Sequence, residues 1–171
     1  RALFLDRLQR SLANRAAPPV RVLILDVDRF KTFNDGYGPD IGDHLLMIMA
    51  RRIQDQLGPE DSATRLTGSQ FAIVFNEPAH GHEDAYARAL MLSLQAPILL
   101  SNQEVVLSVS GGLSMRGLPG VPADELLAQA TNALHSAKAH GLGALAVYDY
   151  GMRNERIAQV ALESELRLAI T

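Results

Sequence analysis

The chain has 171 residues, of which 47% are hydrophobic and 20% charged, with a formal net charge of −3. A chain of this length and composition forms a globular domain that buries its own core without a disulfide or a structural metal. The charge balance excludes a basic nucleic-acid-binding surface, so we expect this segment not to bind nucleic acid. No apolar run is long enough to cross a membrane, so we expect no membrane contact by this segment.

The first third of the chain alternates helical and strand patterns. Apolar residues at helical spacing predict a helix over residues 2–15, which ends before two consecutive prolines. A near-continuous apolar run from Val20 to Leu25 predicts a strand buried on both faces. Residues 31–42 are rich in Gly, Asp and Pro and predict a loop or turn, followed by a helix that begins near Asp43.

The rest of the chain adds two predicted hairpins and three predicted helices. Residues 63–66 and 71–75 flank a tight turn at 67–70 and predict a β-hairpin. The later elements are a polar loop (76–83), a helix (84–95), a second hairpin (99–100 with 105–110), a surface loop (116–122), a helix (124–140), a strand (144–148) and a helix (152–170). This order predicts an α+β fold, with one mixed sheet covered by helices.

Two carboxylates end the first predicted strand. Asp26 and Asp28 alternate along the strand and therefore point to the same face, where they could together face a cation. Mg²⁺ takes few protein carboxylates and completes its coordination with water and substrate phosphates. The same pattern also fits an ordinary polar strand end, or a phosphatase with Asp26 as its nucleophile.

Two further polar residues are candidates for nucleotide recognition. An Asn34 amide and an Asp43 carboxylate have the donors and acceptors that read a guanine edge. The alternative is that Asn34 belongs to a turn and that Asp43 caps a helix. Lys138, near the end of its predicted helix, is most simply a favourable charge near the negative helix terminus.

Taken together, these residues resemble a known family. Residues 25–43 read LDVDRFKTFNDGYGPDIGD and are similar to the D-x-D-x-F-K-x-x-N-D-x-x-G-H-x-x-G-D block of GGDEF domains, the diguanylate cyclases. Further matches follow at 63–65, 109–112 and 133–138. The resemblance covers nearly the whole chain and implies a nucleotidyl-cyclase-like sheet with a ferredoxin-like core, mainly antiparallel and flanked by helices.

The resemblance also implies a division of the chain. Residues 1–150 correspond to the GGDEF domain, and residues 151–171 resemble the helix that leads into an EAL domain, a cyclic di-GMP phosphodiesterase. The chain starts at Arg1 and ends within a helical pattern, so we expect it to be part of a longer bacterial protein. The lack of cysteine fits a reducing compartment, and we expect a cytoplasmic location.

In active family members each domain holds one GTP, and two domains meet to form cyclic di-GMP. The resemblance assigns Asp26 and the Val27 carbonyl as metal ligands. It assigns Asn34 and Asp43 to guanine recognition, and Lys31 and Lys138 to phosphate contacts. These residues are expected as vestiges of the family's nucleotide and metal site.

The chain departs from the family at the signature turn. The expected Gly-Gly-Asp/Glu-Glu-Phe reads here Thr67-Gly68-Ser69-Gln70-Phe71. Ser69 replaces the acid that completes the metal site, and a neutral hydroxyl offsets no phosphate charge. Thr67 replaces a glycine at which the backbone would approach the triphosphate.

Other departures affect phosphate binding and inhibition. Pro39 replaces a histidine, and Leu142 replaces an arginine that would contact phosphate. The product-inhibition motif Arg-x-x-Asp keeps Asp61, but Gly58 stands in place of the arginine, the residue that clamps a phosphate or guanine edge. The inhibitory site is therefore expected to be lost.

These departures predict a catalytically inactive GGDEF domain that acts as a regulatory or scaffold module and requires no cofactor. Its expected partner is an EAL domain in the same chain, and a homodimer is the other partner considered. The alternative function is an allosteric domain that binds GTP and Mg²⁺ weakly and activates the EAL phosphodiesterase. Residual diguanylate cyclase activity is the enzymatic alternative.

Overall fold

The computed structural model describes residues 2–14, 18–76, 84–115, 117 and 120–169, which form six helices and seven strands. In chain order the elements are α1 (Ala2–Ala13), β1 (Val20–Val27), α2 (Phe30–Tyr37), α3 (Pro39–Gln54), β2 (Ser62–Arg65), β3 (Gln70–Asn76), α4 (Ala85–Leu94), β4 (Ile98–Leu100), β5 (Gln103–Val105), β6 (Val109–Leu113), α5 (Ala123–His140), β7 (Leu145–Val147) and α6 (Tyr150–Ala169).

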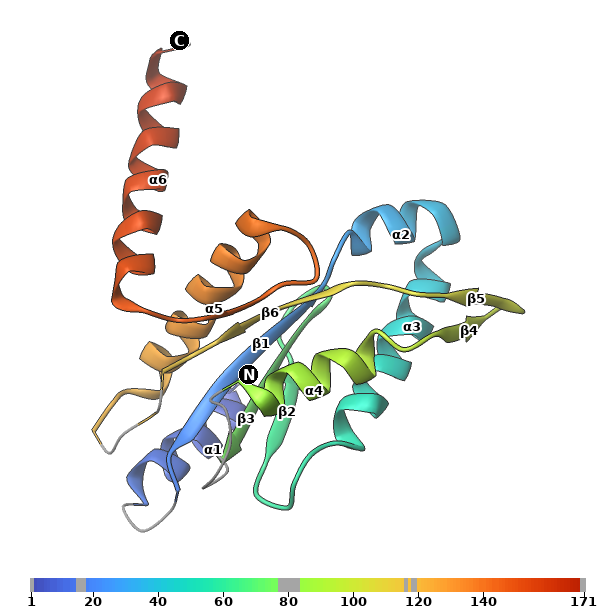
Figure 1. The fold of residues 1–171 in the computed structure, drawn as a ribbon, viewed down its shortest axis with the longest axis horizontal. Helices are drawn as coiled ribbons and strands as arrows, with labels where there is room; N and C mark the ends of the chain where they lie inside the picture. Colours follow the sequence, from blue (N-terminus) through green and yellow to red (C-terminus); the bar gives the residue numbers. More distant parts are fainter. Residues whose placement is uncertain (1, 15–17, 77–83, 116, 118–119, 170–171) are drawn as a thin grey trace.

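Five strands form one sheet in the order β2-β3-β1-β6-β7, with β1 at its centre (Figure 1). All neighbouring pairs are antiparallel except β6 and β7, which are parallel and are joined through α5. A parallel pair needs such a crossover because the chain must return to the same end of the sheet before the second strand begins, and a short turn cannot span that distance. The predicted α+β fold, with a mixed, mainly antiparallel sheet flanked by helices, is confirmed.

Alternate residues of β1 supply two separate hydrophobic cores. Val22 and Ile24 pack with α1 and α5 on one face of the sheet. Leu23 and Leu25 pack on the other face with α2, α3 and α4. All eight residues of β1 are buried, which confirms the predicted strand with two covered faces. Asp26 continues the series of Val22 and Ile24, so it points toward the α5 side.

A glycine in β6 allows α5 to lie unusually close to the sheet. A Cβ added at Gly112 would lie 2.1 Å from the backbone nitrogen of Leu134 and 2.2 Å from the carbonyl oxygen of Ala130. Only a residue without a side chain fits this approach. Since Lys138 follows Leu134 by one helical turn, the contact also brings Lys138 near the end of β1.

The predicted loop over residues 31–42 is wrong, because most of this segment is helical. α2 and α3 are separated only by Gly38, which adopts a positive φ of 88°. Pro39 then occupies the first turn of α3, where its missing N–H costs nothing. Asn34 therefore lies inside α2 rather than in a turn, and Asp43 lies within α3 and is not its N-cap.

The second predicted hairpin is shorter than expected. β4 and β5 pair around Ser101 and Asn102, whose positive φ angles of 48° and 63° close the turn. The chain then leaves this hairpin, and residues 109–113 join the central sheet as β6 beside β1. Residues 77–83 of the predicted polar loop, and residues 116, 118 and 119 of the surface loop, lie outside the described residues.

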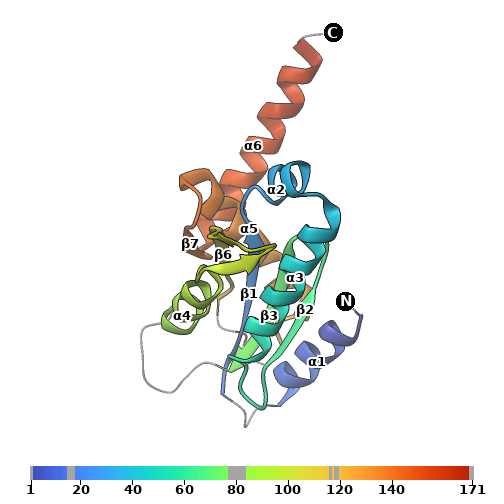
Figure 2. The ribbon, with the colours of Figure 1, turned by 90° about the vertical axis from the view of Figure 1, so that its right-hand side faces the viewer.

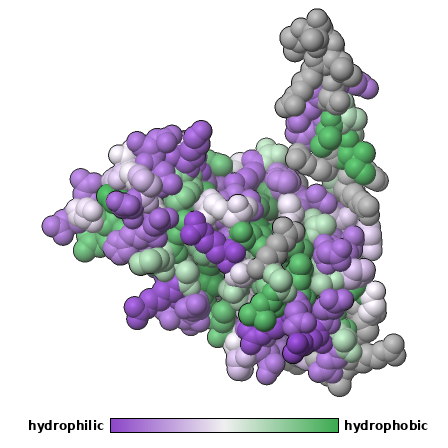
Figure 3. All heavy atoms as spheres, turned by 180° about the vertical axis from the view of Figure 1, so that it is seen from behind, coloured by the Kyte–Doolittle hydropathy of each residue, from purple (hydrophilic) through white to green (hydrophobic). Residues whose placement is uncertain are grey.

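α6 extends away from the rest of the domain in both views (Figures 1 and 2). Four of its apolar side chains are more than half exposed, namely Ile157, Val160, Leu162 and Leu166. Figure 3 shows the corresponding apolar surface on the projecting helix. Among the described helices, none is both long enough and apolar enough to span a bilayer. The assignment of residues 151–171 as a connector stays a prediction.

Candidate functional site

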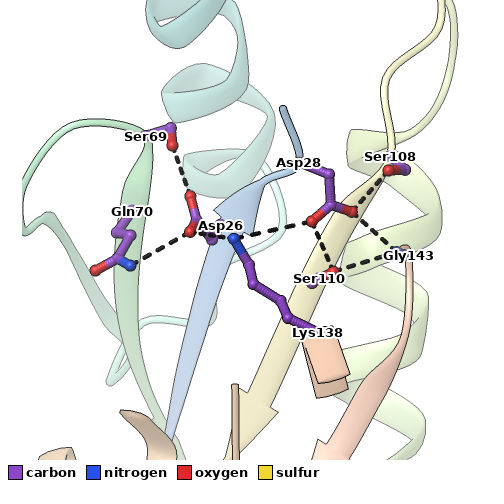
Figure 4. Close-up of polar contacts among 8 residues, drawn as sticks. All are labelled: Asp26, Asp28, Ser69, Gln70, Ser108, Ser110, Lys138 and Gly143. Atoms are coloured by element: carbon purple, nitrogen blue, oxygen red, sulfur yellow. Dashed lines mark hydrogen bonds and ion pairs between the residues drawn. The ribbon is translucent and has the colours of Figure 1, made fainter. Parts of the chain in front are cut away.

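The carboxylate of Asp26, at the end of β1, accepts hydrogen bonds from three side chains (Figure 4). Ser69 Oγ donates to Oδ1 over 2.6 Å, and Gln70 Nε2 donates to Oδ2 over 3.3 Å. Lys138 Nζ lies 2.6 Å from the same Oδ2 and forms a salt bridge with it. Both oxygens of Asp26 are therefore already bound within the chain.

The carboxylate of Asp28 is buried and equally well satisfied. Ser108 Oγ donates to Oδ2 over 2.6 Å, and Ser110 Oγ donates to Oδ1 over 2.8 Å. The backbone N–H of Gly143 adds a bond of 2.9 Å to Oδ2. A buried carboxylate needs such donors because it has lost its water.

Lys138 stands between the two carboxylates and links them. Its Nζ lies 4.0 Å from Asp28 Oδ1 in addition to its contact with Asp26 (Figure 4). The lysine is in the last turn of α5, as predicted, but its charge faces residues that lie 112 and 110 positions earlier in the chain rather than the helix terminus alone. The three groups together carry a formal charge of −1.

The signature turn keeps its hairpin geometry although its chemistry has changed. Gly68 adopts a positive φ of 54°, and its carbonyl accepts a bond of 2.8 Å from Arg65 Nε. Phe71 is buried in the core. Gln70 lies opposite Asp26 in the register of β3 and β1, so the turn delivers its polar side chains directly to that carboxylate.

An open cavity of about 600 Å³ lies beside this turn. Residues predicted from the family pattern line it together, namely Asp26, Val27, Lys31, Asn34, Gly68, Ser69 and Lys138. Within the described residues, Asn34 Oδ1 is buried without a hydrogen-bond partner, packed against Gly42. The amide nitrogen of Asn34 is therefore the end that can face the cavity.

Asp43 lines a second described cavity. That second cavity has a volume of about 370 Å³ and lies between α3 and β2. Its lining is mostly apolar, with Leu46, Ile53 and Phe71 among its residues. Asp43 follows Gly42 in the chain, and Gly42 packs against the Asn34 side chain.

Asp61, the aspartate of the predicted inhibitory motif, is hydrogen-bonded within the fold. Asp61 Oδ2 accepts bonds from the Gly58 N–H over 2.8 Å and from the Tyr86 hydroxyl over 3.2 Å. Asp61 Oδ1 accepts a third bond from the Asn76 N–H over 3.3 Å. Leu142, at the position of the expected arginine, is about half exposed beside the Gly143 contact.

The partners of Asp28 are the residues of this site that sequence reasoning missed. Ser108 directly precedes β6 and Ser110 lies within it, just as Asp26 lies within β1 and Asp28 directly follows it. In the antiparallel register Asp26 lies opposite Ser110. The paired Ser-x-Ser and Asp-x-Asp patterns were the available signal, but only the register shows that they face each other.

Comparison with known proteins identifies the family. The model of the family described as "Diguanylate cyclase, GGDEF domain" matches residues 1–143. The chain belongs to the GGDEF family. Among curated relatives, this GGDEF domain is 32% identical over 149 residues to the cyclic di-GMP phosphodiesterase NbdA of Pseudomonas aeruginosa. It is 30% identical over 172 residues to the bifunctional diguanylate cyclase/cyclic di-GMP phosphodiesterase MucR of the same organism.

The GGDEF domain spans only a fraction of these relatives. The matches cover 87% of this chain but 19% of NbdA, and 99% of this chain but 25% of MucR. Among solved structures, the GGDEF domain of TpbB from Pseudomonas aeruginosa superposes with a TM-score of 0.79 at 34% identity, covering 93% of this chain and 94% of that one. An EAL/GGDEF domain protein from M. capsulatus superposes with a TM-score of 0.68 at 32% identity, covering 87% and 98%.

The residues of this GGDEF domain do not fit the divalent metal that the family resemblance implies. Mg²⁺ needs free oxygen ligands in octahedral geometry. Here an ammonium, a hydroxyl and an amide donate to Asp26, and none of the three brings the negative charge of the acid that the signature turn lacks. In the described part of the chain, no group of three or more Cys, His, Asp or Glu side chains could hold a metal ion.

Proposed function

We propose that this GGDEF domain does not synthesise cyclic di-GMP and acts as a regulatory or scaffold module beside an EAL domain. The observation that carries the proposal is the saturated Asp26 carboxylate, bound by Ser69, Gln70 and Lys138. In a cyclase this carboxylate would be needed for a metal. Here it serves the internal structure of the domain instead.

The chemistry of phosphoryl transfer supports the proposal. Catalysis of this reaction depends mainly on positioning and on cations that neutralise charge on the transferring phosphoryl group. Ser69 supplies no negative charge to hold such a cation, and Leu142 supplies no positive charge for phosphate. Lys138 is engaged by Asp26 at 2.6 Å, so it too is withdrawn from substrate.

Two observations support an EAL domain as the partner. The curated relatives include proteins named for cyclic di-GMP phosphodiesterase activity, and they are four to five times longer than the matched segment. In addition, α6 carries exposed apolar side chains on a helix that leaves the domain. We propose that α6 couples the orientation of this domain to the EAL domain. In this way the GGDEF domain tunes the phosphodiesterase activity of the EAL domain.

The test of catalytic inactivity is incubation of the chain with labelled GTP and Mg²⁺ at high protein concentration. The matched control is Ser69→Ala, which removes the remaining polar group at the position of the acid. The GGDEF domain of TpbB serves as a positive control. We expect no cyclic di-GMP from either form of this chain, and product above the Ser69→Ala level would overturn the assignment.

The second candidate function is an allosteric GTP-binding domain that activates the EAL phosphodiesterase. The retained cavity of about 600 Å³ favours it, because Lys31 and Asn34 still line the space beside the signature turn. A calorimetric titration with GTP, with and without Mg²⁺, distinguishes the candidates. GTP binding that disappears in Asn34→Ala, and that ATP does not reproduce, would favour the allosteric function over a purely structural one.

A further inference from the structure

We propose that Asp149 is a positioning residue that fixes the direction in which α6 leaves the domain, and that residues 148–152 form a stiff joint between the sheet and this helix. Coupling through α6, as proposed above, requires a helix whose base does not swivel, and in that respect the inference rests on the proposed function. The contacts of the joint show what holds the base of α6.

The strand before the joint, β7, is tied to the domain on both sides. Just before β7, the Gly143 N–H donates a 2.9 Å hydrogen bond to Asp28 Oδ2, within the site at the end of β1. Just after β7, the Tyr148 N–H donates a 2.8 Å bond to the Leu113 carbonyl of β6, and the Tyr148 side chain is buried. The chain is therefore fixed to the sheet as far as Tyr148.

Beyond this point, α6 buries little of its surface on the domain. Among the α6 residues whose side chains the structure describes, Met152 alone is partly buried and all others are exposed. Both ribbon views show the helix leaving the domain (Figures 1 and 2). Packing of the described side chains therefore holds only the first turn of α6, and the direction of the whole helix depends on that turn.

Asp149 closes this first turn. Its Oδ1 accepts a 2.7 Å hydrogen bond from the Gly151 N–H and a 3.2 Å bond from the Met152 N–H. The Met152 N–H is shared with the Asp149 carbonyl, also over 3.2 Å. The first N–H groups of a helix lack an acceptor one turn earlier, and an aspartate that directly precedes the helix supplies one. The carboxylate also suits the positive end of the helix dipole.

The cap is placed between two aromatic rings that brace the joint. The rings of Tyr148 and Tyr150 pack edge to face, with centroids 6.1 Å apart, on either side of Asp149 in the chain. The helix has 20 residues. A tilt of about 20° at its base would move the far end of a helix about 30 Å long by about 10 Å. A small loosening at Asp149 is therefore greatly amplified along α6.

The experiment is a pulsed electron paramagnetic resonance measurement of the distance between two spin labels on the chain. The chain contains no cysteine, so Leu92→Cys and Leu166→Cys introduce the only two labelling sites. Both positions are more than half exposed, one on α4 and one on α6. We expect one narrow distance distribution when Asp149 is present.

The decisive variant is Asp149→Ala in the same labelled chain. It should broaden the distribution at least about twofold, because the first N–H groups of α6 lose their acceptor and the first turn frays. Asp149→Asn keeps an acceptor oxygen and removes the charge, and it should retain the narrow width. The matched control is Asp124→Ala, the same change at an exposed acid in the first turn of α5, which should also leave the width unchanged.

Three outcomes would overturn the inference. The first is equal width in Asp149→Ala and in the chain that keeps Asp149. The second is an Asp149→Asn distribution as broad as that of Asp149→Ala, because the cap would then not be the cause. The third is a broad distribution in the chain that keeps Asp149, which tests the stiff joint even if Asp149→Ala does not fold.

The inference and the proposed function can fail separately. A helix α6 that swivels freely in a domain that makes no cyclic di-GMP would overturn the stiff joint and leave catalytic inactivity intact. Synthesis of cyclic di-GMP from GTP would overturn the proposed function, whatever width the spin labels report.

Discussion

The hydroxyl of Tyr86 donates a 3.2 Å hydrogen bond to Asp61 Oδ2, which connects the start of α4 to the turn before β2. The same carboxylate accepts bonds from the backbone of Gly58 and Asn76. Asp61 thus joins three segments of the domain. Asp61 therefore has a structural role in this chain.

We predict that Asp61→Asn destabilises the domain by about 1–3 kcal/mol. The amide keeps one acceptor oxygen, so at least one of the backbone or hydroxyl donors loses its partner, and an unsatisfied buried donor costs this amount. Urea unfolding followed by circular dichroism measures the change. Glu60→Gln, at an exposed residue of the same turn, is the control and should leave stability within about 0.5 kcal/mol of wild type. Equal stability of both variants would contradict the structural role.

Tyr86 should make the domain less stable at alkaline pH. Burial, then the charge of Asp61 and their hydrogen bond, raise the pKa of Tyr86 well above its usual value. Above pH ~10 the unfolded chain releases this proton while the folded domain keeps it, so the free energy of unfolding falls as pH rises, by at most about 1.4 kcal/mol per pH unit.

The variant Tyr86→Phe has no such proton and should show a shallower fall in unfolding free energy between pH ~9 and ~11. Urea unfolding at several pH values measures the slope. Tyr150→Phe, at a residue that is 72% exposed, is the control and should retain the wild-type slope. Identical slopes for wild type and Tyr86→Phe would show that the Asp61 contact does not persist in solution.

Gly112→Ala should strongly disrupt the fold. The new methyl group would collide with backbone atoms of α5, and backbone cannot rotate away as a side chain can. We expect a loss of several kcal/mol, beyond the roughly 1–3 kcal/mol typical of overpacked cores, or failure to fold. Gly36→Ala in α2 is the control, since no atom lies within 4 Å of the added Cβ, and it should be neutral or slightly stabilising. Thermal unfolding of both variants tests the difference.

Restoring the signature turn should not restore catalysis. The triple variant Thr67→Gly, Ser69→Glu and Gln70→Glu recovers the family's acids, but Lys138 remains beside Asp26 and Leu142 still offers no charge to phosphate. We expect no cyclic di-GMP from labelled GTP. Production of cyclic di-GMP by the triple variant would show that the turn alone disables the domain.

The parts of the fold that local sequence determines were predicted well. The apolar run of β1 and the hairpin around Gly68 depend on neighbouring residues, and both are confirmed. α2 was missed because glycine and proline are typical of loops, whereas here Gly38 and Pro39 separate two helices. Local composition does not distinguish a loop from a short break between helices.

The family pattern named residues that the structure brings together, but it did not predict the contacts between them. The family pattern identified Asp26, Ser69 and Lys138, and the structure places all three together. It did not predict that Lys138 would pair with Asp26, or that Ser108 would hold Asp28, because these contacts join residues 112 and 80 positions apart. Such pairs depend on strand register and helix placement, which no single segment encodes.

The position of β1 in the sheet has a consequence for synthesis of the chain. β1 leaves the ribosome before any of its strand neighbours, yet it is flanked by β3 on one side and by β6 on the other. One edge of an eight-residue, fully buried strand thus stays unpaired until residues 109–113 have been made. An unpaired apolar edge is a template for association with other chains. The nascent domain is therefore prone to aggregate until residues 109–113 have been made, and chaperone binding before that stage would protect it.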